Sequence, residues 1–155
     1  MAFYNAYLTP KQRHLWRLRF DGHSQSEISR KTGVTRQTIN KAFGVINSKV
    51  TKALLEGAKF NRIEISRLDM ERGYLLGRSM KFGLEALITF SDENGLQTWY
   101  KGEGNCSKCE TVESCRKSLI IEAEIRHIHI PLNSEIEHPS QIADILFEKI
   151  MEEAG

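Results

Sequence analysis

Residues 24–41 hold the feature that most restricts how this chain can fold, because helix-capping and turn-forming residues occur there at fixed offsets. Ser24 and Glu27 have the spacing of a capping box, in which each side chain bonds the backbone N–H of the other residue. Gly33 tolerates the positive φ at which many helices end. Thr35 can cap a second helix, so the pattern predicts two helices joined by a three-residue turn.

The residues between these signals predict how the two helices pack. Ser29 is small enough for the helices to approach each other, and Val34 and Ile39 can fill the angle between them. A further helix is predicted over residues 8–20, where Pro10 suits the first helical turn. Together these segments predict a helix-turn-helix unit in the N-terminal third of the chain.

The helix that follows the turn is predicted to continue as a long linking helix. Apolar and small residues recur along it at alternating steps of four and three, the spacing of a coiled-coil seam. This predicted seam comprises Ile39, Phe43, Ile46, Val50, Ala53 and Gly57. The stripe favours a homodimer formed through this helix, and packing of the helix on the next part of the same chain is the alternative.

Beyond the linking helix the pattern changes from helical to extended. Apolar and polar residues alternate in residues 60–101, and Asn94-Gly95 supplies the positive φ angles of a tight hairpin turn. Residues 114–126 and 139–153 have helical periodicity, whereas 127–130 alternate as an extended segment. The predicted fold class is therefore α+β, with an all-helical N-terminal part and a small antiparallel sheet after it.

Charge divides the chain at the same place. Residues 1–59 carry 11 Lys and Arg against three acids, a net charge of +8, and residues 60–155 carry 11 against 17 acids, a net charge of −6. A basic unit beside an acidic one is typical of a nucleic-acid-binding domain with a partner domain, although charge alone fits a solvated charged face equally well. We therefore expect a helix-turn-helix domain with its linking helix over residues 1–59 and an α+β sensor domain over residues 60–155.

Several classes of protein are disfavoured. No apolar run approaches the about 20 residues of a membrane span, and residues 1–8 lack the basic and apolar regions of a secretory signal, so a cytoplasmic protein is expected. Motifs of serine hydrolases, zinc proteases and P-loop proteins are absent, so no enzymatic activity is expected. Glu122 and Glu124 are expected to be solvated helix residues.

The side chains of the helix-turn-helix unit predict contacts with double-stranded DNA. Its second helix would lie in the major groove. The side chains that it would present to base edges there are those of Arg36, Gln37, Asn40 and Lys41. Arg pairs with guanine through two hydrogen bonds, and Gln or Asn pairs with adenine in the same way. DNA phosphates are bound by hydroxyls, amides, cations and the N–H groups at helix N-termini. The residues expected to contact phosphates here are Ser24, Gln25, Arg30, Lys31 and Thr35.

Residues 8–41 resemble the DNA-reading module shared by sigma factor region 4, LuxR-type regulators and archaeal Tfx-type regulators. The resemblance rests on the helix starts and the turn described above, and it covers roughly the first third of the chain. It implies a sequence-specific DNA-binding transcription regulator, and its Tfx-like character implies an archaeon or a strict anaerobe as the source.

A second cluster combines three cysteines, Cys106, Cys109 and Cys115, in the spacing C-x2-C-x5-C. Cys115 is predicted near a helix N-terminus, where the helix dipole favours the thiolate that binds metals. Structural zinc and four-iron clusters both take four donors, one more than the cysteines supply. The fourth is expected from His127 or His129, which alternate with isoleucines on the predicted extended segment.

The cysteine loop resembles the cluster-binding loop of Fnr-type oxygen-responsive regulators, in which three closely spaced cysteines and one distant ligand hold a 4Fe-4S cluster. The likeness covers ten residues and implies a cofactor that senses redox state or oxygen. The residues themselves leave an iron-sulfur cluster, a zinc site and thiols without a metal open. If zinc is structural, a small molecule bound in the sheet domain near Trp99 would be the signal.

Overall fold

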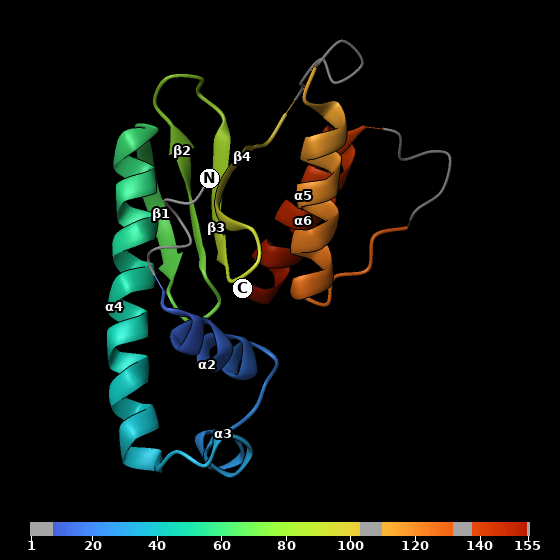
Figure 1. The fold of residues 1–155 in the computed structure, drawn as a ribbon. Coiled ribbons are helices and arrows are strands. Elements are labelled where there is room, and N and C mark those ends of the chain that lie inside the picture. Colours follow the sequence, from blue (N-terminus) through green and yellow to red (C-terminus); the bar gives the residue numbers. More distant parts are fainter. Residues whose placement is uncertain (1–7, 103–109, 132–137, 155) are drawn as a thin grey trace.

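The computed structural model describes residues 8–102, 110–131 and 138–154. A four-stranded antiparallel sheet is covered by helices on both faces (Figure 1), so the predicted α+β class is confirmed. The helices are α2 (Pro10–Phe20), α3 (Gln25–Thr32), α4 (Arg36–Phe60), α5 (Val112–Ile125) and α6 (Pro139–Ala154). The strands are β1 (Ile63–Asp69), β2 (Tyr74–Ser79), β3 (Glu85–Ser91) and β4 (Gly95–Tyr100). None of these helices is both long and apolar enough to cross a membrane.

The helices of the N-terminal part begin and end where the capping residues predict. The Thr9 hydroxyl accepts a hydrogen bond from the Gln12 N–H and starts α2. The Ser24 hydroxyl accepts one from the Glu27 N–H, and the Glu27 carboxylate accepts one from the Ser24 N–H, which completes the predicted capping box of α3. Gly33 ends α3 with a φ of 72°.

The turn between α3 and α4 is held from within the unit. The Ser29 hydroxyl donates to the Val34 carbonyl at 2.6 Å, so this small residue both permits the close approach and bonds across the turn. Ile28 of α3 and Ile39 of α4 have no exposed surface, because they pack into the core that the three helices share. The helices, the turn and the packing predicted for residues 24–41 are confirmed.

Helix α4 is 25 residues long and uses the predicted seam to pack within its own chain. Ile46, Val50 and Ala53 have no exposed surface, and the other seam residues are also buried. At Gly57 the helix lies so close to the sheet that an added Cβ would be 3.0 Å from Leu96 Cδ2. The stripe therefore packs within its own chain, which was the alternative interpretation. A second copy of the chain cannot reach these buried residues.

The sheet is a meander in which each strand pairs with the next one along the chain, in the order β1-β2-β3-β4. The predicted hairpin forms, since Ser91 pairs with Gly95, but of the two residues expected at positive φ only Gly95 has it, at 67°. A register shift between Ile65 and Arg67 interrupts the pairing of β1 with β2.

The two faces of the sheet belong to two hydrophobic cores. Leu75, Ile88 and Phe90 face α4 and share a core with residues of α2 and α3. The alternate residues, among them Leu87 and Trp99, pack against α5 and α6 on the other face (Figure 1). The first core runs from the helix-turn-helix unit into the sheet, so it crosses the expected domain boundary between residues 59 and 60.

The segment 127–130 differs from its prediction, because no strand forms there. His127 has a φ of 56°, and the Ile128 N–H bonds back to the Ala123 carbonyl at the end of α5. Ile128 and Ile130 are nevertheless buried while His127 and His129 are exposed. The alternation arises because every second residue fills the second core, without pairing to a strand.

Candidate functional site

The exposed face of the helix-turn-helix unit carries the four side chains expected to read bases. Arg36, Gln37, Asn40 and Lys41 are all exposed and lie in the first turns of α4. Ile39, between them in sequence, points the other way and is fully buried. The structure thus places these four side chains together on the outer side of α4, where they are exposed to solvent.

The residues expected at phosphates divide into two groups. Arg30 and Lys31 are exposed in the last turn of α3. Ser24 and Thr35 are exposed too, but their hydroxyls accept hydrogen bonds from the N–H groups that start α3 and α4. Arg30 and Lys31 therefore keep their side chains available, whereas the two hydroxyls have a structural role already.

An acidic side chain lies next to Ser24. Hydrogen bonds from His23 and from the Ser24 backbone hold the pKa of the Glu27 carboxyl below its ordinary value. A carboxylate that stays ionised would repel a phosphate at this hydroxyl, which makes Ser24 the weakest of the predicted phosphate contacts. Gln25 is half-buried, and its Nε2 donates to Asn40 Oδ1 at 3.3 Å.

Among the three cysteines, the structure places Cys115. Cys106 and Cys109 lie outside the described residues. Cys115 is the fourth residue of α5 and is half-buried, so its predicted position near a helix N-terminus is confirmed. Within the described parts of the chain no group of three or more His, Cys, Asp or Glu side chains is arranged to hold a metal.

The two predicted histidine donors lie at the other end of α5. Ile125 lies ten positions after Cys115 in the helix, a distance of about 15 Å at 1.5 Å per residue, and His127 and His129 come after Ile125. His127 Nε2 is 3.4 Å from Asp21 Oδ1, in the helix-turn-helix unit. The structure does not bring His127 to Cys115.

Sequence reasoning missed a histidine at the end where Cys115 lies. Pro139 and Ser140, at the start of α6, line a pocket together with Cys115, and His138 directly precedes them. Pro139 is a sequence signal for a helix start, which places His138 at a helix N-terminus. That α5 and α6 begin at the same end of the molecule is tertiary information, so no sequence signal could pair His138 with Cys115.

A largely apolar pocket of about 400 Å³ lies between β4 and the first turns of α5 and α6. Trp99 and Tyr100 line it, with Cys115 and Leu119 on the α5 side. The Trp99 indole N–H donates to the Thr89 hydroxyl at 3.1 Å, which fixes the ring in the sheet. The pocket is bordered by residues on either side of the undescribed segment 103–109, namely Gly102 and Cys115.

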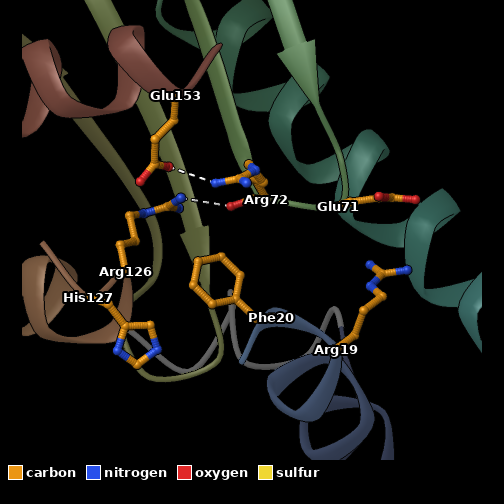
Figure 2. A pocket seen from close by; sticks show the side chains of 7 residues that line it. All are labelled: Arg19, Phe20, Glu71, Arg72, Arg126, His127 and Glu153. Atoms are coloured by element: carbon orange, nitrogen blue, oxygen red, sulfur yellow. Dashed lines mark hydrogen bonds and ion pairs between the residues drawn. The ribbon is translucent and has the colours of Figure 1, made fainter. Parts of the chain in front are cut away.

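At the opposite end of α5, four elements meet around a second pocket of about 430 Å³ (Figure 2). Its lining includes Arg19 and Phe20 from α2, Arg72 from the β1–β2 turn and Glu153 from α6. Arg126, next to the end of α5, lies 5.4 Å from the centre of the Phe20 ring. We call this place the α2–α5 junction.

The α2–α5 junction contains a buried ion pair that sequence reasoning missed. Glu122, expected to be solvated, has no exposed surface, and Arg126 Nε donates to its Oε1 at 2.9 Å. The other nitrogens of Arg126 donate to the carbonyls of Arg72 at 2.7 Å and Gly73 at 2.9 Å. The expectation for Glu122 was wrong, because a helical period alone does not show that a cation one turn away is buried too.

Helix α2 is attached to the sheet as well as to its own helical unit. The Trp16 ring stacks on Phe20 and meets Phe90 of β3 edge to face, with ring centres 5.9 Å apart. Arg17 donates two hydrogen bonds to Asp92, at 3.0 and 2.6 Å. The helix-turn-helix unit is therefore coupled to the sheet through α2, in addition to the continuous helix α4.

Comparison of the chain with protein-family models, with curated proteins and with solved structures finds no match.

Proposed function

We propose that this protein is a sequence-specific DNA-binding transcription regulator. The observation that supports it is the exposed cluster of Arg36, Gln37, Asn40 and Lys41 in the first turns of α4. These side chains stand on a helix-turn-helix unit with a net charge of +8 over residues 1–59. Basic charge supplies affinity for any duplex, and donors and acceptors that reach base edges supply sequence preference.

In the proposed complex, the first turns of α4 enter the major groove. Arg36 offers two parallel donors to guanine, while Gln37 and Asn40 offer amides. Arg30 and Lys31 neutralise phosphates beside the groove, together with N–H groups at the start of α4. Sequence is read by the first group and affinity is raised by the second.

The regulator is expected to bind as a homodimer on a site of two half-sites, about 34 Å apart, since one helical turn separates successive exposures of the same groove. The seam of α4 is buried within each chain, so the surface that joins two copies is a different one.

The regulating signal is proposed to act at the cysteine loop. Cys106, Cys109 and Cys115 would hold a 4Fe-4S cluster with a fourth donor, and the position of Cys115 in the first turns of α5 favours its thiolate. Such a cluster would supply a centre that changes on oxidation. His138 is a better candidate for the fourth donor than His127, because it lies at the Cys115 end of α5.

Helix α5 connects this loop to the DNA-binding unit. Cys115 lies in its first turns, and Arg126 and His127 at its other end contact Phe20 and Asp21. A change at the loop that shifts α5 would therefore act on α2, which is packed with α3 and α4. Regulation by this route requires two positions of α5, each favoured by one state of the loop.

The first test is DNA binding by the purified protein. Sites selected from random duplex DNA should share a motif, and Arg36→Ala should lower affinity by about 1–3 kcal/mol and relax one base position. Lys31→Ala is the matched control, since it should weaken all sequences alike and reduce the dependence on salt. Failure to select any motif would contradict the proposed function.

The second test is metal analysis of protein purified without oxygen. About four iron and four sulfide per chain, with DNA binding that changes in air, are the expected result. Cys115→Ser should remove this response and leave the DNA motif unchanged. Absence of iron, or binding that does not respond to air, would contradict a cluster sensor.

A second candidate function keeps DNA binding and makes the metal structural zinc. The pocket lined by Trp99 and Tyr100 favours it, since apolar pockets with a few polar groups commonly bind small molecules. One zinc per chain, binding insensitive to air, and quenching of Trp99 fluorescence by an apolar ligand would support it.

A further inference from the structure

We propose that Gln25 positions the Asn40 side chain and thereby selects the base that Asn40 reads, an inference that rests on the proposed DNA-binding function. Gln25 is the first residue of α3, and Asn40 lies in the second turn of α4. Gln25 Nε2 donates to Asn40 Oδ1 at 3.3 Å, on the exposed side of the unit. Ile28 of α3 and Ile39 of α4 belong to the same buried core, which fixes the two helices behind this hydrogen bond.

The hydrogen bond limits what Asn40 can offer to DNA. A side-chain amide has one oxygen that accepts and one NH₂ group that donates twice. Gln25 uses one of the two lone pairs of the Asn40 oxygen and turns this oxygen toward α3, so the NH₂ group faces the groove. Adenine pairs with both ends of an amide, whereas guanine presents two acceptors, N7 and O6, at its major-groove edge. Asn40 held by Gln25 therefore prefers guanine to adenine.

Two substitutions at residue 25 distinguish base selection through Asn40 from a contribution of Gln25 to affinity alone. In Gln25→Ala the Asn40 oxygen is released, and the amide can pair with adenine at both ends. In Gln25→Glu the carboxylate only accepts, so it takes a hydrogen bond from the Asn40 NH₂ group and turns the oxygen toward DNA. The oxygen then suits bases that donate in the major groove, cytosine through N4 and adenine through N6.

The experiment is selection from random duplex DNA with the full chain and with these variants, followed by affinities on single-base variants of the selected site. The wild-type protein should select guanine at one position of the site. At this position the Asn40→Ala variant should show no base preference. Gln25→Ala should raise adenine over guanine there by on the order of tenfold, and Gln25→Glu should favour cytosine or adenine. The double variant of Gln25→Ala and Asn40→Ala should show the same preference as Asn40→Ala alone.

The outcomes keep the two proposals apart. If the wild type selects a motif but both Gln25 variants keep its base preference and only lower affinity, Gln25 is a phosphate contact or a structural residue, and the inference is overturned alone. If the wild type selects no motif, the proposed function and the inference both fail. Gln25→Glu has nearly the shape of the natural side chain, so the inference stays testable even if Gln25→Ala folds poorly.

Discussion

Replacing Arg126 by Met tests the buried ion pair that ties α5 to the sheet. The side chains of Arg126 and Glu122 are 4% and 0% exposed, and Arg126 also donates to the carbonyls of Arg72 and Gly73. Met preserves most of the aliphatic stem but donates nothing. Arg126→Met therefore leaves a buried carboxylate without its cation and three backbone carbonyls, those of Arg72, Gly73 and Phe90, without a donor from residue 126.

Removal of one partner of a buried ion pair costs about 3–5 kcal/mol, because the remaining charge stays out of water. In a chain of this size each kcal/mol lowers Tm by about 2–4 °C, so a fall of roughly 10 °C is expected. Urea unfolding followed by circular dichroism should show a lower midpoint with an unchanged slope, since the surface exposed on unfolding stays the same.

Arg72→Met is the matched control, because Arg72 lines the same pocket but pairs with Glu153 in solvent. These two side chains are 54% and 43% exposed, so their 2.7 Å ion pair should contribute no more than about 1 kcal/mol. If Arg126→Met unfolds within about 1 kcal/mol of the wild type, or no earlier than Arg72→Met, the reasoning is refuted. Adding Glu122→Leu to Arg126→Met should recover part of the loss, because it removes the stranded charge.

Three further substitutions have expected signs. Gly33 and Gly44 both have empty space where a Cβ would lie, but Gly33 has a φ of +72° and Gly44 lies inside α4. In thermal unfolding, Gly33→Ala should therefore destabilise by about 1–2 kcal/mol, whereas Gly44→Ala should stabilise by about 1 kcal/mol; equal signs would contradict this. Burial raises the pKa of Asp144 above its ordinary 3.8, more than Lys101 lowers it, and Asp144 Oδ1 is buried without a hydrogen-bond partner among the described residues. Because the folded state favours the protonated form of Asp144, the free energy of unfolding is highest below the ordinary pKa and falls as pH rises through the raised pKa. Asp144→Asn should raise Tm at neutral pH, with the gain disappearing near about pH 3, and a gain that persisted in acid would contradict the burial effect.

Local rules predicted much of the N-terminal unit. The caps at Ser24 and Thr35 and the positive φ of Gly33 depend on residues no more than three positions away, so they can be identified without tertiary contacts. The same holds for the hairpin at Asn94-Gly95. The side chains expected to read bases were also accessible to sequence reasoning, because the α4 residues that alternate with buried Ile39 and Phe43 must face outward.

The remaining features depend on contacts between distant segments. The buried stripe of α4 has the same period whether a second copy or the same chain covers it, and only the fold shows that α2, α3 and the sheet of the same chain do. Glu122 looks like a surface residue until Arg126 is seen buried beside it. His127 and His129 seemed able to reach the cysteine loop because they follow it in sequence, but they come after the end of α5 that lies opposite Cys115.

The sequence by itself determined where helices and hairpins start and stop, since capping, glycine φ angles and apolar period act over a few residues. It also determined the net positive charge of residues 1–59, because charge needs no packing to be counted. Only the tertiary structure decided that α2 is attached to the sheet through Trp16 and Arg17, and that Gln25 meets Asn40. Those contacts join residues far apart in the chain, and their free energy exists only once the two cores have formed around them.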